Sequence, residues 1–200
     1  MGFAVWKLGG SLFDLPDLAD RIYKLYAQPS PALPVVIIPG GGMFADAIRT
    51  MDKVHQLDPL DSHHLALDAM RLSASVVAAL LETSAVRDSD TQKATMEAWK
   101  SGHEEPALHV WDVIDSWNTL QPSIELQYSP VPTDWRLTSD SISAALAAYW
   151  GADKLVLVKS IDRPEGTSWE SLMKEGAVDE VFPQIAPHVR RVEWVNLRAQ

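Results

Sequence analysis

The sequence predicts an α/β fold in which helices cover a mainly parallel sheet. Short apolar runs, several of them rich in β-branched residues, recur along the chain, and most are followed by a break and then by apolar residues at helical spacing. The runs show little alternation of polar and apolar residues, so each strand is expected to be buried on both faces. Such strands belong to parallel sheets with helices on their faces.

Two units of strand, glycine break and helix open the chain. Gly9 and Gly10 end the first apolar run, and Gly40–Gly42 end the second. After each break, apolar residues recur three and four positions apart, which is the spacing of one helix face. The elements predicted here are strands over 3–8 and 35–38 and helices over 15–26 and 43–51.

The middle of the chain combines a long apolar helix with a less regular stretch. Residues 64–82 are apolar around most of the helix, so we expect it to be buried, with small residues that allow close packing, also across a dimer. A strand over 107–111 and a short helix over 112–120 follow. Three prolines make 122–135 loop-rich.

A helix-capping signature marks the last third of the chain. Thr138, Ser139 and Asp140 precede apolar residues at helical spacing, and Gly151 ends that helix. The elements predicted here are a helix over 142–149, a strand over 154–159, helices over 169–175 and 179–185, and a last strand over 192–195. Because no repeat or linker interrupts the pattern, residues 1–200 are predicted to form a single domain.

Composition narrows the classes of function. The chain has 17 basic and 27 acidic residues, a net charge of −10, which argues against broad binding to nucleic acid or anionic membranes. Any phosphate-binding site must therefore be a small region of positive charge on an otherwise acidic protein. There is no cysteine, which excludes disulfides and thiolate chemistry. The apolar stretch before Lys7 is too short for a signal peptide and no run approaches the roughly 20 residues of a membrane span, so we expect a soluble, cytoplasmic protein.

The glycine breaks are suited to binding anions. The amides of Gly9–Gly10 and Gly40–Gly42 have no side chains in the way, and each loop runs into a helix N-terminus with its partial positive charge. Lys7 and Ser11 add a cation and a hydroxyl to the first loop. One such loop can reflect turn geometry alone. Two loops at the carboxyl ends of parallel strands favour a shared ligand site.

Three charged residues suggest phosphoryl transfer. This chemistry needs cations around the moving group and a carboxylate that holds them, and Lys7, Asp140 and Lys159 each stand at a predicted strand end or helix start. The plain alternatives are a helix cap for Asp140 and a solvated strand end for Lys159. Neither loop continues as a Walker A motif, and the dinucleotide pattern of glycines is also absent.

At these residues the chain resembles the amino acid kinase superfamily, which includes acetylglutamate, aspartate, uridylate, carbamate and isopentenyl phosphate kinases. The matching segments are VWKLGGS over 5–11, IPGGG over 38–42, TSDSISAALA over 138–147 and ADKLVLVKSID over 152–162. The segments HHLALDAM over 63–70 and WRLTSD over 135–140, together with the short length, are similar to small kinases related to a methanofuran-pathway enzyme. That enzyme converts an aminomethylfuran methyl phosphate to its diphosphate.

The resemblance implies a three-layer α/β/α sandwich, with the acceptor bound by about residues 1–135 and the nucleotide by about 136–200. It implies that Lys7 and Lys159 neutralise the transferring group and that Asp140 orients them. The implied nucleotide contacts are Gly9, Gly10, Ser11, Ser139, Ser160 and Asp162, and the implied acceptor contacts are Gly40, Gly41, Gly42 and His64. ATP would be the donor, and Mg²⁺ would bind mainly through nucleotide oxygens, with no dedicated protein site. A homo-oligomer, dimeric or larger, is expected.

One departure from the family pattern follows Lys159. Larger members have an extended nucleotide-binding segment there, whereas here only residues 160–166 precede Trp169, and the final Asp-Gly of many members is missing. The sequence therefore leaves open how adenine would be recognised and whether ATP is the donor.

Other residues have competing interpretations. His63 and His64, with a carboxylate one turn later, could bind a metal, but a place near the acceptor pocket or at the helix start is favoured. Trp6, Trp111 and Trp135 could line a substrate cavity, although core packing is the commoner role of tryptophan.

The leading functional hypothesis is an ATP- and Mg²⁺-dependent kinase that converts a small phosphomonoester to a diphosphate, for example an aminomethylfuran phosphate. An acceptor phosphate is largely ionised near neutral pH, which fits a site with no evident general base. One alternative is a kinase for a carboxylate or carbamate acceptor. Another is a nucleotide-binding sensor or storage protein that has lost catalysis.

Overall fold

Five parallel strands form the sheet, in the order β3-β2-β1-β4-β5, in a computed structural model that describes residues 2–28, 33–103, 107–128 and 130–200. The strands are β1 (Ala4–Leu8), β2 (Val35–Pro39), β3 (Leu108–Val110), β4 (Lys154–Lys159) and β5 (Val192–Asn196). Every strand predicted from the apolar runs is present. Part of the proline-rich segment before β2, residues 29–32, lies outside the described residues.

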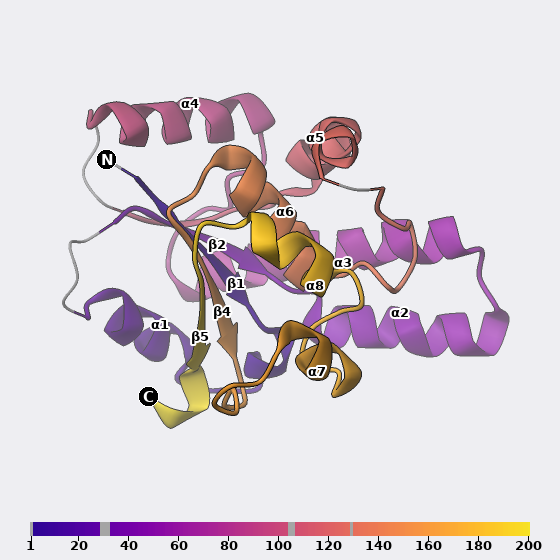
Figure 1. Ribbon diagram of the computed structural model, residues 1–200. Helices are drawn as coiled ribbons and strands as arrows, with labels where there is room; N and C mark the ends of the chain where they lie inside the picture. The colour runs from indigo at the N-terminus through magenta and orange to yellow at the C-terminus, as the bar shows by residue number, and fades with distance from the viewer. Residues whose placement is uncertain (1, 29–32, 104–106, 129) are drawn as a thin grey trace.

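Helices cover both faces of this sheet, as Figure 1 shows with α4, α5 and α6 on one side and α1 on the other. The α-helices are α1 (Leu18–Tyr26), α2 (Gly42–His55), α3 (Pro59–Leu80), α4 (Ser89–Ser101), α5 (Ile114–Gln127), α6 (Ser139–Trp150), α7 (Trp169–Lys174) and α8 (Phe182–Ile185). Short 3-10 helices are η1 (Gly10–Leu12), η2 (Ala186–His188) and η3 (Leu197–Ala199). The arrangement confirms a three-layer α/β/α sandwich.

Successive residues of a strand pack into two apolar layers, one on each face of the sheet. On β1, Val5 packs with the cluster that includes α4, α5 and α6, whereas Trp6 and Leu8 pack with α1 and the second half of α3. This period of two follows from the pleat of a strand, in which successive side chains point to opposite faces. Lys7 therefore comes to the same face as α6.

The register brings the glycine loops to one edge. Leu8, the last residue of β1, pairs with Pro39 of β2 and with Val158 of β4. The loops that follow β1, β2 and β4 consequently leave the sheet side by side. This edge is where ligands of open α/β sheets bind.

Two helices differ from the sequence prediction. Helix α5 runs through Pro122 to Gln127, although 122–135 was expected to be loop, because Ile124 is fully buried and keeps this stretch packed on the core. Helix α4 was not predicted. Its Asp88 caps it by accepting a hydrogen bond from the Thr91 amide, and its buried residues include Met96 and Trp99.

The long helix α3 is buried on only one face. Expected to be buried all round, it leaves several large apolar side chains exposed in the single chain, because α2 and the sheet cover one side only. These exposed residues are Leu60, Leu65, Leu72, Val76 and Leu80. In Figure 1, α2 and α3 extend together beyond the sheet. Across the described residues, no helix combines the length and apolar character needed to cross a membrane.

Candidate active site

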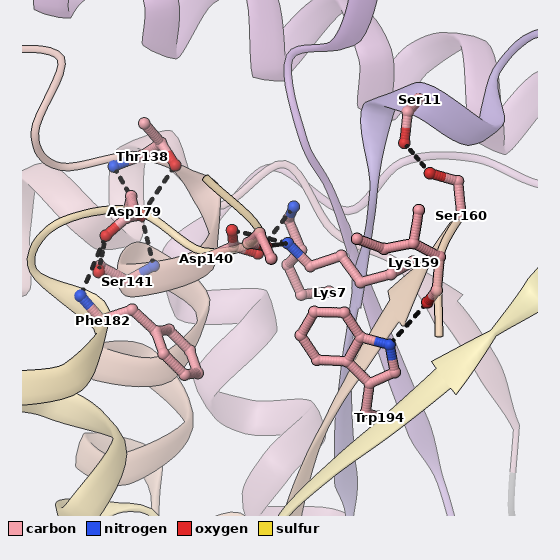
Figure 2. Close-up of polar contacts among 12 residues, drawn as sticks. Lys7, Ser11, Thr138, Asp140, Ser141, Lys159, Ser160, Asp179, Phe182 and Trp194 are labelled. Carbon is pink, nitrogen blue, oxygen red and sulfur yellow. Dashed lines mark hydrogen bonds and ion pairs between the residues drawn. The ribbon is translucent and has the colours of Figure 1, made fainter. Parts of the chain in front are cut away.

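Two buried lysines share one buried aspartate at the carboxyl edge of the sheet. Lys7 Nζ lies 2.9 Å from Asp140 Oδ1, and Lys159 Nζ donates a hydrogen bond of 2.8 Å to Asp140 Oδ2. Figure 2 shows the three side chains converging. Lys7 and Asp140 are each 5% exposed, and Lys159 is 9% exposed. Lys159 is therefore not the solvated strand end of the alternative interpretation. The structure thus brings all three predicted charged residues together.

Strand parity and helix position explain this convergence. Lys7 follows Val5 on the α6 face of β1, and Lys159 follows Leu157 on the same face of the adjacent strand β4. Asp140 lies in the first turn of α6, which packs on that face. A carboxylate there is also favoured by the positive end of the helix dipole.

Charge coupling shifts the protonation of the cluster. Burial opposes ionisation of Asp140, but Lys7 and Lys159 outweigh it and lower the pKa of this carboxyl below its ordinary value. Burial, followed by the like charge of Lys7, lowers the pKa of Lys159 to about 8, although Asp140 opposes this shift. The Asp140 carboxylate is therefore favoured in its ionised form between the two lysines.

The glycine loops approach each other too closely for side chains. A Cβ added at Gly10 would lie 2.2 Å from Gly42 Cα, and one added at Gly40 would lie 2.8 Å from Ser139 Oγ. The Gly9 amide donates to the Val158 carbonyl, so this N–H is occupied by the sheet. Gly9 therefore permits a close approach and is not placed to donate to a ligand.

The second loop offers amides at a helix N-terminus. The Gly40 amide is also occupied, since it donates to the Leu8 carbonyl at 2.8 Å. Gly41 is the N-cap and Gly42 the first residue of the 14-residue helix α2, where N–H groups lack partners within the helix. Gly42 has φ of 53°, a conformation that favours glycine. Such amides at the N-terminus of a helix are suited to binding an anion.

A cavity of about 340 Å³ opens between these loops, α3 and the start of α6. Its polar wall includes Lys7 and Ser139, and its apolar wall includes Leu67, Met70 and Ile142. Gly10, Ser11 and Gly40–Gly42 border it as well. The cavity therefore combines Lys7 of the charged cluster with room for a small organic molecule.

Arg49 and Trp135 form one side of this cavity. The Arg49 guanidinium lies 4.5 Å from the centre of the Trp135 ring and pairs with Asp46 at 2.8 Å. The Trp135 indole donates a hydrogen bond of 2.6 Å to Asp52 Oδ2, which holds the ring in place. Of the three tryptophans considered from the sequence, Trp135 lines the cavity, whereas Trp6 and Trp111 are core residues.

The structure places His63, not His64, at the cavity. His63 is buried and lines it, whereas His64 is exposed and lines a separate hollow beside Asp68 and Arg71. Consecutive helix residues point about 100° apart, so only one of the pair can face the site. Burial, and next the neighbouring His64, lower the pKa of His63, which is consequently neutral near pH 7.

The expected nucleotide contacts separate into two groups. Ser11 and Ser160 lie side by side after β1 and β4, with 2.8 Å between their hydroxyl oxygens, as Figure 2 shows. Ser139 lies on the cavity wall near Gly40, and Ser11 borders the same cavity. Asp162 is exposed and accepts a hydrogen bond from Asn196 at 3.0 Å, so the structure does not bring it to the cavity.

An aspartate absent from the predicted site caps α6. Thr138 occupies the N-cap position, but its hydroxyl donates to Asp179 Oδ2 at 2.8 Å and does not cap the helix itself. The Ser141 amide donates to the same oxygen at 3.1 Å. The signal that could have identified Asp179 is its position as the first residue of the helix predicted over 179–185, where aspartate is a common cap. Its partners, about forty residues earlier, could not be read from the local pattern.

The residues of this site suit a divalent ion that is bound together with phosphates. Within the described ranges, no three His, Asp or Glu side chains form a group that could hold a metal. Mg²⁺ usually keeps several waters and binds substrate phosphates. The bare amides at Gly41–Gly42 and the two lysines suit such phosphates, so nucleotide oxygens would be its main ligands.

Comparison with known proteins identifies the family. The family model described as "Amino acid kinase family" matches residues 2–163. The 5-(aminomethyl)furan-3-yl methyl phosphate kinase of Methanocaldococcus jannaschii is 29% identical over 157 residues, which are 78% of this chain and 65% of that protein. This chain thus corresponds to about two thirds of the relative's length.

Solved structures show the same fold. The uridylate kinase of Archaeoglobus fulgidus superposes with a TM-score of 0.61 at 14% identity, over 100% of this chain and 93% of that one. The UMP kinase of Ureaplasma parvum gives a TM-score of 0.61 at 13% identity, over 98% and 90%. With the family match over most of the sequence, these findings confirm the predicted fold and the resemblance: the chain belongs to the amino acid kinase family, a family of phosphotransferases.

Proposed function

We propose that this protein transfers the γ-phosphoryl group of ATP to a small phosphomonoester and produces a diphosphate. The observation that carries the proposal is the pair of buried lysines on Asp140, 2.9 and 2.8 Å away, of which Lys7 lines a cavity that also presents the N-terminus of α2. Two anionic reactants can meet only where their charges are neutralised. The cluster supplies that neutralisation without a general base.

The proposed reaction needs little from the protein beyond position and charge. An ionised oxygen of the acceptor phosphate attacks the γ-phosphorus, the bond from γ-phosphorus to the β,γ-bridging oxygen breaks, and ADP leaves with that electron pair. Lys7 and Lys159 would face the moving group, and Asp140 would hold both ammonium groups. Mg²⁺ on the nucleotide oxygens would supply further positive charge when it is bound.

The acceptor is proposed to lie against α2 and α3. Its phosphate would meet the amides of Gly41 and Gly42, and its organic part would occupy the space beside Leu67 and Met70. Within that space, Asp46 and the neutral His63 could accept hydrogen bonds from an amino group. An aminomethylfuran phosphate, the substrate class in the name of the Methanocaldococcus relative, fits these features and is the first acceptor to test.

Phosphorus NMR tests the proposal directly. Wild-type protein is incubated with ATP and Mg²⁺ and with the aminomethylfuran phosphate, isopentenyl phosphate or UMP, and an Asp140→Asn variant serves as control. We expect the coupled signals of a new diphosphate with at least one acceptor and on the order of 10²-fold less with the variant.

Two other outcomes would contradict this function. Hydroxylamine trapping of an acyl phosphate from a carboxylate or carbamate acceptor, with no diphosphate formed, would assign the carboxylate-kinase alternative. Tight ATP binding without transfer to any acceptor would favour the nucleotide-binding sensor or store.

A further inference from the structure

We propose that Asp179 is a positioning residue for phosphoryl transfer, because it fixes both Asp140 and Lys159 while touching neither reactant. The inference rests on the proposed function, since it assigns Asp140 and Lys159 to the transfer site. Asp179 lies in the turn between α7 and α8, on the far side of Asp140 from Lys7, as Figure 2 shows.

The Asp179 carboxylate accepts six hydrogen bonds. Its Oδ2 accepts from the Thr138 amide at 3.0 Å, the Thr138 hydroxyl at 2.8 Å and the Ser141 amide at 3.1 Å. Its Oδ1 accepts from the Ser141 hydroxyl, from the Val181 amide at 3.2 Å and from the Phe182 amide at 3.1 Å. One side chain thereby joins two segments that are 41 residues apart.

The first group of bonds holds Asp140. Thr138 and Ser141 flank Asp140 in the sequence, and both are tied to the same carboxylate. The start of α6 is consequently fixed on each side of the aspartate that pairs with the two lysines. A cap from Thr138 itself would have satisfied the helix locally. The bond to Asp179 instead couples the helix to a distant segment.

The turn that contains Asp179 also holds Lys159. Its Nζ donates a hydrogen bond of 2.8 Å to the Ala177 carbonyl, two residues before Asp179. The amides of Val181 and Phe182 close the turn on the other side of Asp179. Loss of the carboxylate would therefore loosen the turn that presents the Ala177 carbonyl to Lys159.

Asp179 also acts on Lys159 through its charge. The charged groups that face Lys159 are Lys7 on β1, Asp140 on α6 and Asp179, and the two carboxylates raise the pKa of the ammonium against the effects of burial and Lys7. Burial, followed by the charge of Asp140, raises the pKa of Asp179 itself, and hydrogen bonds from Ser141 and Thr138 oppose that rise. A neutral residue at 179 should consequently lower the pKa of Lys159.

Asp179→Asn tests the positioning role, with Glu175→Gln as a matched control. Glu175 is an exposed acid in the same segment, so its substitution removes the same charge without touching the network. We expect Asp179→Asn to lower kcat by about 10- to 100-fold, with KM for both substrates changed by less than about threefold. The basic limb of kcat/KM should move to lower pH, whereas Glu175→Gln should match the wild type.

A substrate-free measurement separates this inference from the proposed function. The pKa of Lys159 is followed by NMR titration of its side chain, with Lys159→Arg used to assign the signal. A lower pKa in Asp179→Asn supports the inference even if no acceptor has been found, whereas failure of the wild type to transfer phosphate would refute only the proposed function. A folded Asp179→Asn protein with unchanged kcat and unchanged Lys159 titration would overturn the inference.

Ser141→Ala covers the case in which Asp179→Asn does not fold. This variant removes one hydrogen bond from the carboxylate and keeps its charge. We expect kcat to fall by about two- to tenfold while the pKa of Lys159 stays in place. An unchanged kcat in Ser141→Ala would then overturn the inference.

Discussion

Gly10 and Gly42 lie against each other so closely that a methyl group on Gly10 would sit 2.2 Å from the Gly42 Cα. One belongs to the loop after β1 and the other to the start of α2. The contact joins the two phosphate-binding loops proposed for donor and acceptor. Glycine at position 10 is therefore required by the close approach of the two loops and not by the conformation of its own turn.

The first prediction is that Gly10→Ala separates the loops. Because the atom in the way is backbone, the cost cannot be relieved by a rotamer change, and we expect a loss of about 1–3 kcal/mol in the free energy of unfolding together with most of the turnover. Thermal melts and steady-state kinetics measure both. Gly9→Ala is the control, since a Cβ added at Gly9 would lie 3.1 Å from its nearest atom, the Val158 carbonyl oxygen. Equal melting temperatures in the two variants would contradict the prediction.

The second prediction concerns pH. With the pKa of Lys159 at about 8, its ammonium form is lost as pH rises above that value, so kcat/KM should fall about tenfold per pH unit on the basic side. Bound ATP adds negative charge and should raise the pKa, placing the corresponding limb of kcat at higher pH. In Lys159→Arg, whatever its absolute rate, the basic limb should vanish because arginine keeps its proton. A wild-type profile that stays level to pH 9.5 would argue against this role.

The third prediction removes one cation. Lys7→Met keeps an apolar stem of similar length in the buried site, and Asp140 retains Lys159 as its partner. We expect a fall in kcat on the order of 10²-fold, as for other preorganised charges, with the fold preserved. Lys24→Met on the exposed side of α1 should leave kcat at its wild-type value. If Lys7→Met retained full kcat, the transfer site would have to be reassigned.

Apolar runs and glycine breaks were enough to predict the strands and the edge at which the site lies. Even the convergence of Lys7 and Lys159 follows from strand parity, which needs only the order of the neighbouring strands. The face of α3 could not be predicted in the same way, because His63 and His64 differ by about 100° and only packing selects one. Asp179 was missed for a related reason, since four of its six bonds come from Thr138 and Ser141, which are 41 and 38 residues away.

The fourth prediction concerns the exposed apolar side chains of α3. Leu72 and Val76 lie one turn apart and are 47% and 38% exposed, an arrangement typical of surfaces that pair with another chain. We expect light scattering to give a mass at least twice the 22.1 kDa of one chain. A Leu72→Glu, Val76→Glu double variant should fall to a single chain without loss of circular dichroism. A wild type of 22.1 kDa would contradict the expected homo-oligomer.

The fifth prediction separates acceptor binding from nucleotide binding through Arg49. Its guanidinium is held over the Trp135 ring at the cavity, on the side proposed for the acceptor, so we expect it to contact the acceptor and not the nucleotide. Hydrogen bonds to charged groups contribute about 1.5–3 kcal/mol, which corresponds to roughly 10- to 100-fold in affinity. Arg49→Met should therefore raise the KM for the acceptor by about that factor and leave the KM for ATP within about twofold.

Lys53 provides the control for Arg49. It is an exposed cation on the same helix and lies outside the cavity lining, so Lys53→Met removes the same charge from α2 without touching the acceptor. A general electrostatic attraction of anions to α2 would make the two variants alike. If acceptor binding depends on the Arg49–Trp135 pair, only Arg49→Met weakens it, and the difference persists at high salt because a contact inside the cavity is screened less than an exposed charge.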